Sequence, residues 1–300
     1  MSGVARMTET TCTVAALVSA AAQQLRAAGI DTPQLDAEIL IAHAMNTDRV
    51  GLRVRSRESA DAWRDNAQAL IDRRASGEPV QYITGVAPFR HLMVQVDPRV
   101  LIPRPETELL VTWALEHAAR MHERTSAPVR IVDVCTGSGC VALAIQTEAG
   151  EQSVSVCGSD ISAAALEVAR ANAQALQAPI TWIESDLLTD ITGPVELITA
   201  NPPYIARSDE HTLAREVRDH EPALALFLPG DGENPVALLQ RLAAQAIERL
   251  VDGGHLAVEI GMGQHESVAA ALRDAGFTSV SWICDLQDIP RIVTGTKGEA

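Results

Sequence analysis

Four consecutive residues, Asn201-Pro202-Pro203-Tyr204, follow an apolar segment and combine an amide, two imino acids and an aromatic ring. Each proline lacks an N–H group and fixes its own φ, and it also holds the preceding residue in an extended conformation. An amide side chain, free backbone carbonyls and a flat ring are therefore presented on a rigid arc. Such an arc is either a plain strand exit or a device that grips a small planar group.

Further polar residues end three other predicted strands. Gly137 and Gly139 follow the strand at 129–135, where they allow a tight turn and a close backbone approach to a ligand. Asp160 ends the next strand, and in nucleoside-binding sheets an acid at this position accepts hydrogen bonds from ribose hydroxyls. Asp186 ends the third strand, where the edge of an adenine would lie.

The carboxyl ends of parallel strands meet at one edge of a sheet, where open α/β sheets bind their ligands. A glycine turn, two acids and an amide at that edge suit a nucleoside with a ribose and an amine, such as S-adenosylmethionine. Gly137, Gly139 and Ala142 also fit the dinucleotide fingerprint G-x-G-x-x-A, so a nicotinamide-dependent oxidoreductase is an alternative. A purely structural glycine turn is the third interpretation.

The elements that must position these residues alternate along the second part of the chain. This alternation predicts an α/β domain with a doubly wound, mainly parallel sheet, a Rossmann-like fold. The predicted strands are 129–135, 154–160, 180–186, 195–204, 255–261, 278–285 and 291–297, and the predicted helices are 139–149, 162–176, 234–250 and 265–276.

The first part of the chain has a different character. Helical spacing of apolar residues predicts helices at 14–25, 34–43 and 61–76. We therefore expect a small all-helical domain over 1–79, a β-hairpin linker over 80–102 and the ligand-binding domain over 103–300. A basic cluster lies between the second and third helices, and it is either a solvated face or a contact for an RNA-rich or acidic partner. Its members are Arg49, Arg53, Arg55 and Arg57.

Composition narrows the functional classes. The net charge is −15 and most of the acidity lies after residue 80, which argues against direct DNA binding because phosphate contacts need Lys and Arg. The five cysteines are scattered without a CxxC pair, so neither a metal site nor a disulfide framework is predicted. No apolar run is long enough to span a membrane. We expect a cytoplasmic protein with reduced thiols.

Several motifs together resemble one family, the bacterial release factor glutamine methyltransferases (PrmC/HemK family). They are "PVQYITG" at 79–85, "VLIPRPETELLV" at 100–111, "DVCTGSGCVALAI" at 133–145, "NPPY" at 201–204, "EPALAL" at 221–226, "GGHLAVEIG" at 253–261 and a closing "RIVTG". The resemblance covers almost the whole chain. It implies methyl transfer from S-adenosylmethionine to the side-chain amide nitrogen of the glutamine in the Gly-Gly-Gln (GGQ) loop of peptide chain release factors. It also implies that the helical N-terminal domain helps to recognise the release factor.

The resemblance assigns roles to site residues. An amide nitrogen is a poor nucleophile, and two acceptors aimed at its N–H bonds would turn its lone pair toward the methyl group. The Asn201 side-chain oxygen and the Pro202 carbonyl are the candidates, with Tyr204 packed on the flat amide as the third catalytic residue. Pro203 completes the substrate-binding set, and no metal is required. The cofactor-binding set is Cys135, Thr136, Gly137, Ser138, Gly139, Asp160, Asp186, Leu187 and Asn201.

Two of these residues depart from the family pattern. Cys135 stands where the family usually has glycine, and Leu187 replaces an aromatic residue beside the adenine. The segment Glu106-Thr107-Glu108 is interpreted either as part of the pocket or as ordinary chemistry of a helix N-terminus. The polar residues that follow NPPY are expected in a lid or on the surface, and they include His211, His220 and Glu221.

NPPY alone leaves rivals within the same chemistry. Amino-methyltransferases that act on nucleic acid also carry this motif, and close relatives of the family act on a ribosomal protein. A nicotinamide-dependent oxidoreductase would not need NPPY. "PRPETE" favours a release factor enzyme over the relatives that act on a ribosomal protein, and the acidity of the second part of the chain argues against a nucleic-acid substrate.

Overall fold

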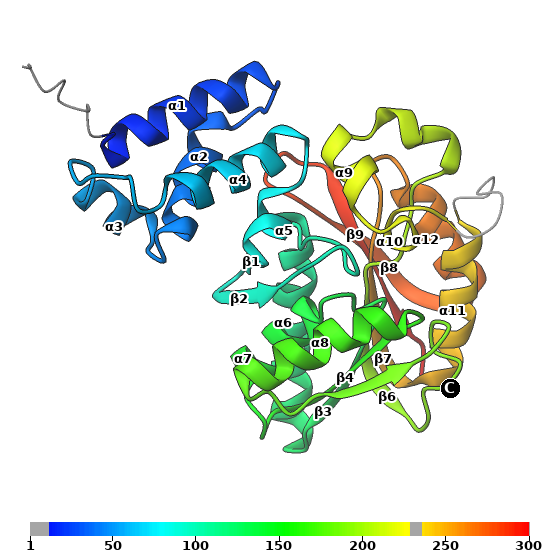
Figure 1. Cartoon of the computed structure of the whole chain (residues 1–300). Coiled ribbons are helices and arrows are strands. Elements are labelled where there is room, and N and C mark those ends of the chain that lie inside the picture. The colour runs from blue at the N-terminus through cyan, green and yellow to red at the C-terminus, as the bar shows by residue number, and fades with distance from the viewer. Residues whose placement is uncertain (1–11, 229–235, 300) are drawn as a thin grey trace, which may run out of the picture. The chain divides into compact units, whose positions relative to one another are not determined.

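The structure is a computed structural model, and it describes residues 12–228 and 236–299 (Figure 1). The first eleven residues of the predicted helical domain and the first two of the helix predicted at 234–250 lie outside the described residues. The chain forms two compact units. One comprises Met1–Gly85 with Arg215–His220, and the other comprises Val86–Ala214 with Glu221–Ala300.

The smaller unit is helical. Thr13 caps its first helix by accepting a hydrogen bond from the Ala16 N–H group, and Asp48 caps the short third helix through the Gly51 N–H group. The helices predicted at 14–25, 34–43 and 61–76 are present, whereas the third helix was not predicted. The helices are α1 Val14–Ala27, α2 Pro33–Ala44, α3 Arg49–Val54, α4 Arg64–Ala75, α5 Val80–Thr84 and α9 Arg215–His220.

A buried ion pair links the helices of this unit. The Arg74 guanidinium donates to the Asp36 carboxylate at 2.6 Å, and both side chains are almost fully buried. The same guanidinium lies 2.7 Å from the Glu216 carboxylate. These contacts explain why a segment far along the chain belongs to the helical unit, which sequence periodicity did not predict.

The larger unit begins with a hairpin formed by β1 (Val86–Phe89) and β2 (Leu92–Gln95). This hairpin lies inside the segment 80–102 predicted as a hairpin linker, but residues 80–84 of that segment form helix α5. The buried Asn172 side chain accepts from the Gln95 N–H group at 2.6 Å and donates to the Gln95 carbonyl at 3.0 Å. The hairpin is therefore fixed to the rest of its unit by a two-way hydrogen bond.

A seven-stranded sheet forms the centre of the larger unit, with strand order β5-β4-β3-β6-β7-β9-β8. All neighbours are parallel except the two pairings of β9, which is antiparallel to both β7 and β8. The predicted doubly wound, mainly parallel fold is confirmed. The strands are β3 Val129–Val134, β4 Val154–Asp160, β5 Thr181–Glu184, β6 Val195–Ala200, β7 Leu250–Glu259, β8 Phe277–Cys284 and β9 Pro290–Lys297.

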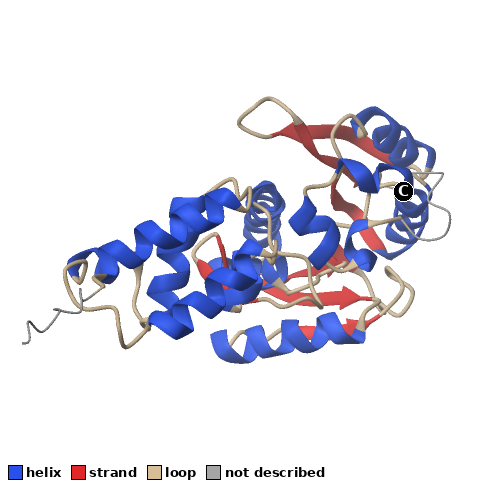
Figure 2. Cartoon of the chain, turned by 45° about the horizontal axis from the view of Figure 1, so that its top comes forward, coloured by secondary structure: helices blue, strands red, loops and turns tan. Residues whose placement is uncertain are grey.

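Helices cover both faces of this sheet (Figure 2). In β6, the successive residues Leu197, Ile198, Thr199 and Ala200 are all fully buried, as expected for a strand covered on both sides. The remaining elements of the unit are η1 Pro105–Thr107, α6 Glu108–Thr125, α7 Cys140–Ala149, α8 Ala163–Leu176, η2 Arg207–Thr212, α10 Ala223–Leu226, α11 Ala237–Arg249 and α12 His265–Asp274.

The strand order reverses between β3 and β6. The chain leaves β3 toward β4 on one side, whereas β6 leads to β7 on the other. A crevice at the carboxyl ends of these strands is the expected ligand site of such a sheet. Among the described helices, none combines the length and the apolar character that crossing a membrane requires.

Candidate active site

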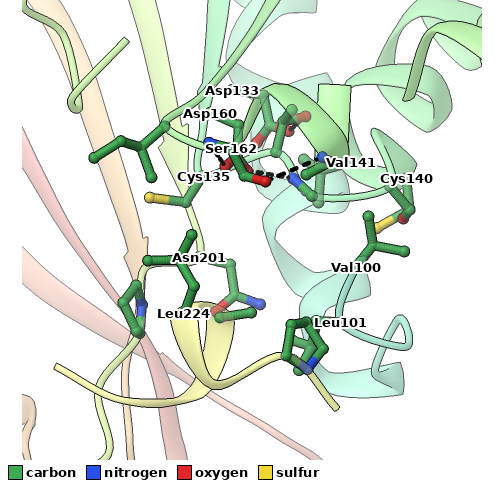
Figure 3. Close-up of a pocket in the computed structure, with 18 of the residues that line it drawn as sticks. Val100, Leu101, Asp133, Cys135, Cys140, Val141, Asp160, Ser162, Asn201 and Leu224 are labelled. Carbon is green, nitrogen blue, oxygen red and sulfur yellow. Dashed lines mark hydrogen bonds between the residues drawn. The ribbon is translucent and has the colours of Figure 1, made fainter. Parts of the chain in front are cut away.

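A pocket of about 330 Å³ lies at the carboxyl ends of β3, β4, β5 and β6. Figure 3 shows Asp133, Cys135 and Asp160 on one side of it and the Asn201 amide on the other. The pocket therefore brings together residues from all four strand ends at which the sequence predicted a ligand.

The loop between β3 and α7 forms one wall through left-handed backbone. Cys135, Gly137 and Gly139 have φ values of 57°, 55° and 80°. This conformation strains a residue with a side chain, so Cys135 is a strained position in the pocket wall. A Cβ atom built on Gly137 would have no atom within 4 Å, and a ligand can therefore approach its backbone closely.

Asp160 connects two pieces of backbone at the rim of the pocket. One carboxylate oxygen accepts from the Gly137 N–H group at 2.9 Å, and the other accepts from the Ser162 N–H group at 2.9 Å. Burial raises the pKa of Asp160, and these backbone hydrogen bonds oppose that shift. The predicted ribose acid therefore also holds the glycine loop in place.

Asp133 is a buried acid beneath the same loop that was not assigned a role from the sequence. Its two oxygens accept from the Thr136 hydroxyl at 2.6 Å and from the Thr199 hydroxyl at 2.8 Å. Burial raises the pKa of Asp133 to about 6, despite these hydrogen bonds. Since Thr199 lies on β6, this carboxyl group ties the glycine loop to the strand that ends at Asn201.

Asp186 and Leu187 follow β5. The Asp186 carboxylate accepts from the Arg241 guanidinium at 2.5 Å, and both side chains are about half exposed. Leu187 is buried and has a φ of 56°, a second strained position in the pocket wall. The pairing with Arg241 was not predicted, because Arg241 belongs to a helix that begins some fifty residues later in the sequence.

Asn201 stands at the end of β6, where the strand ladder stops before the two prolines. Its side-chain NH₂ group donates to the Thr107 hydroxyl at 3.2 Å. Thr107 is 3% exposed and lines the pocket. Of the two interpretations of the segment 106–108, part of the pocket or a helix N-terminus, the first holds for this residue. The NH₂ group is thus turned toward Thr107, and the carbonyl oxygen is the acceptor that the Asn201 side chain offers.

The wall opposite the sheet comes from two segments outside the alternating units, residues 99–104 and 222–227. Glu221 joins them, since its carboxylate accepts from the Ile102 N–H group at 3.2 Å and from the Arg104 guanidinium at 2.5 Å. The side chain of Glu221 is 1% exposed, so of the two predicted locations, lid or surface, the surface is excluded for this residue. The Ile205 N–H group donates to the Leu226 carbonyl at 3.2 Å, which ties this wall to the NPPY arc.

Most of the predicted site residues line this pocket, and three do not. Gly139 packs against Trp182 and Ala169, Pro202 is buried, and the Tyr204 ring lies against Gly261. The Gln264 amide donates to the Tyr204 carbonyl at 3.1 Å. The predicted residues that line it are Cys135, Thr136, Gly137, Ser138, Asp160, Asp186, Leu187, Asn201 and Pro203.

Comparison with known structures shows which proteins share the fold, and a family model adds the class. The chain is similar to the hMettl16 catalytic domain, with a TM-score of 0.53 at 16% identity over 80% of this chain and 83% of that one. It is also similar to the human methyltransferase 10 domain containing protein, with a TM-score of 0.50 at 15% identity over 69% and 88%. A family model for the methyltransferase small domain matches residues 114–220. The fold and the site define a Rossmann-like class I methyltransferase, whose cofactor is S-adenosylmethionine.

Sequence relatives identify the family. A model described as the PrmC N-terminal domain matches residues 16–85. The release factor glutamine methyltransferase of Koribacter versatilis is 38% identical over 280 residues, which are 92% of this chain and 96% of that protein. The enzyme of the same name from Mycolicibacterium smegmatis is 39% identical over 286 residues, or 93% and 96%. The chain belongs to the release factor glutamine methyltransferase family.

Proposed function

We propose that the chain transfers a methyl group from S-adenosylmethionine to the side-chain amide nitrogen of the glutamine in the GGQ loop of peptide chain release factors. The observation that carries this proposal is the Asn201 amide, whose NH₂ group is held by Thr107 while its oxygen is left as an acceptor in the pocket. Membership of the release factor glutamine methyltransferase family supports the choice of substrate.

The residues of the pocket fit S-adenosylmethionine. A volume of about 330 Å³ lies within the range of small-ligand sites, and the open face of Gly137 leaves room for a ligand against the backbone. Asp160 would accept from the ribose hydroxyls, and Asp186 with Leu187 would flank the adenine. When bound, the cofactor supplies a methyl group on a sulfonium, which is a strong electrophile.

The NPPY arc orients the nucleophile. The lone pair of an amide nitrogen is delocalised into its carbonyl, so the nitrogen attacks only when it is held in a suitable pose. The Asn201 oxygen and the Pro202 carbonyl accept from its two N–H bonds, and the two prolines keep these acceptors from reorganising. Pro203 lines the pocket. The Tyr204 ring lies outside the pocket lining, and we expect it to pack on the flat amide only when glutamine is bound.

The helical unit serves recognition of the release factor. Its match to the PrmC N-terminal domain supports this role. A chain that starts at Val86 should still bind S-adenosylmethionine but lose most of its activity on an intact release factor. Full activity of the shortened chain on the intact protein would refute the role. All five cysteines are free, as is usual in the reducing cytoplasm, where we place the enzyme.

The test of the proposed function is methyl transfer from radiolabelled S-adenosylmethionine to purified release factor. The expected result is one labelled methyl per release factor, and none when the GGQ glutamine is changed to alanine. Duplex DNA and ribosomal protein are incubated in parallel as competing substrates. Equal labelling of the alanine variant, or labelling of DNA or ribosomal protein instead, would overturn the proposal.

A further inference from the structure

We propose that Arg104 binds the carboxylate of the methionine part of S-adenosylmethionine, so that the cofactor is held on both sides of its reactive sulfonium. This inference rests on the orientation proposed above, with the ribose at Asp160 and the methyl group toward Asn201. It adds a cation to a cofactor site whose assigned charged residues, Asp160 and Asp186, are both acidic.

The charges of the cofactor call for such a group. S-adenosylmethionine carries a sulfonium, an ammonium and a carboxylate, and the carboxylate needs hydrogen-bond donors in place of the water that it loses on binding. Among the described residues, three arginines are the only cationic side chains that line the pocket, and they are Arg99, Arg104 and Arg241. A guanidinium can bind a carboxylate through two parallel hydrogen bonds, so these three residues are the candidates with a matching charge.

The strand order determines which end of the pocket the methionine part occupies. Asp186 follows β5, Asp160 ends β4, and Asn201 follows β6 on the far side of β3. With the adenine at Asp186 and the ribose at Asp160, the sulfonium and the methionine chain continue toward β3 and β6. The carboxylate is therefore expected near Asn201 and not near Asp186.

Two of the three arginines are engaged elsewhere. Arg241 is paired with Asp186 at 2.5 Å, which places it at the adenine end. Arg99 already has a carboxylate at each of its guanidinium nitrogens. Its Nε and Nη2 atoms donate to Asp97 at 2.9 and 2.7 Å, and its Nη1 atom donates to Glu167 of α8 at 2.9 Å.

Arg104 belongs to the segment that supports Asn201. It immediately precedes η1, and its carbonyl accepts from the Thr107 N–H group at 3.1 Å. The Thr107 hydroxyl in turn accepts from the Asn201 amide at 3.2 Å. Of the three arginines, Arg104 is therefore the one at the end of the pocket where the carboxylate is expected.

The Arg104 guanidinium is fixed on one side and open on the other. Its Nη2 atom donates to the Glu221 carboxylate at 2.5 Å, and the Glu221 side chain is 1% exposed. The Nε and Nη1 atoms have no acceptor among the described residues, and the Arg104 side chain is 33% exposed. An arginine that is already held by a buried acid loses little further freedom when it binds a second carboxylate, so the group is preorganised.

Two fixed points on the cofactor set the direction of its methyl group. In the covalent structure the sulfonium lies between the ribose and the amino acid chain. Asp160 would hold the ribose and Arg104 the carboxylate, which limits rotation about the bonds to sulfur. The methyl group is then kept toward Asn201, where the nucleophile is oriented.

Calorimetric titration with two ligands tests the assignment in the absence of release factor. The ligands are S-adenosylhomocysteine and its decarboxylated analogue, 5′-(3-aminopropylthio)-5′-deoxyadenosine, which lacks only the carboxylate. The wild-type protein should prefer S-adenosylhomocysteine by about tenfold to hundredfold, as expected for a hydrogen bond between charged groups. Arg104→Gln should lose this preference by binding S-adenosylhomocysteine more weakly, without weaker binding of the analogue. Equal losses for both ligands, or no preference in the wild type, would overturn the inference.

A double variant guards against damage to the wall of the pocket. Arg104→Gln alone leaves the buried Glu221 without its cation, which is strongly destabilising. Arg104→Gln/Glu221→Gln removes both charges, and a glutamine at position 221 can still accept from the Ile102 N–H group. The double variant should therefore fold and show no preference for the carboxylate, whereas Glu221→Gln alone should keep the preference. A preference that persists in the double variant would overturn the inference.

Arg99→Gln and Arg241→Gln are the matched controls, since each changes another arginine of the pocket lining. Both should keep the wild-type preference. Its loss in Arg99→Gln instead of Arg104→Gln would overturn this inference alone. Its loss in Arg241→Gln instead would mean that the cofactor lies the other way round, and the proposed orientation would fail as well. A preference that depends on Arg104 in a protein that does not methylate release factor would refute the proposed function and leave this inference standing.

Discussion

Replacement of Gly139 by alanine tests whether the glycine loop is fixed by its contact with Trp182. Gly139 caps α7 with φ 80° and ψ 8°, so a side chain there has the left-handed conformation that costs about 1–2 kcal/mol. A Cβ atom on Gly139 would also lie 2.7 Å from Cη2 of Trp182 and 3.2 Å from Cβ of Ala169. Gly158 on β4 also lies against the indole and limits its movement on that side.

Backbone strain and overpacking together set the loss in the free energy of unfolding. Overpacking of this kind commonly costs about 1–3 kcal/mol, and the lower entropy of the unfolded alanine chain returns about 0.4–1 kcal/mol. Gly139→Ala should therefore lower the free energy of unfolding by about 1–5 kcal/mol. Displacement of the loop should also weaken binding of S-adenosylmethionine, because the adjacent Gly137 backbone and Asp160 form the same wall.

Gly85 provides a control with matched backbone. It has φ 76° and ψ 7°, and a Cβ atom built on it meets nothing within 4 Å. Gly85→Ala should therefore cost only the backbone strain, about 1 kcal/mol. Urea denaturation followed by circular dichroism measures both variants, and calorimetry measures their affinity for the cofactor. Equal destabilisation by the two variants would show that the contact with Trp182 does not fix the loop.

Three further predictions concern polar residues of the pocket. Asn201→Ala should bind S-adenosylmethionine yet transfer the methyl group about a hundredfold more slowly, since one preorganised acceptor is lost. A near-normal single-turnover rate would mean that NPPY is only a strand exit. Asp160→Ala should weaken cofactor binding by about 1–3 kcal/mol in calorimetry, and an unchanged affinity would contradict its assignment. The pKa of Asp133 is raised to about 6 in the folded protein. Between about pH 4 and pH 6 the folded protein therefore keeps a proton that the unfolded chain has lost. The wild-type protein thus loses stability as the pH rises through that window. Asp133→Asn should lack this loss, so its melting temperature relative to wild type should rise from pH 4 to pH 7; a constant difference would contradict the raised pKa.

The sheet was predictable because its signals are local. A mainly apolar run at 129–134, a glycine turn and the helix after it lie within some twenty residues, and the strand–helix unit recurs along the chain. Once the strands are parallel, their carboxyl ends lie at the same edge of the sheet, and no further information is needed to place them there. For this reason Gly137, Asp160 and Asn201 could be placed around one pocket from the sequence.

The other wall depends on contacts that no local pattern encodes. Glu221 bonds Ile102 across 119 positions, and Asn201 bonds Thr107 across 94. Pro105 and the acids beside it predict a helix start equally well whether or not Thr107 faces a ligand. Helix α3 was missed because it has only six residues, although the Asp48 cap on the Gly51 N–H group was a readable signal.

The order of the last strands has a consequence for how the molecule assembles. β8 precedes β9 in the chain, yet β9 pairs with β7 and β8 touches the sheet only through β9. β8 can therefore pair with the sheet only through β9. The turn between them is organised locally, since Asp285 accepts from the Gln287 and Ile289 N–H groups at 2.8 and 3.1 Å and from Arg291 at 2.8 Å. The turn that joins β8 to β9 is thus held by contacts among residues 285–291 that do not involve β7, so the two outermost strands form a hairpin with a turn of its own at the edge of the sheet.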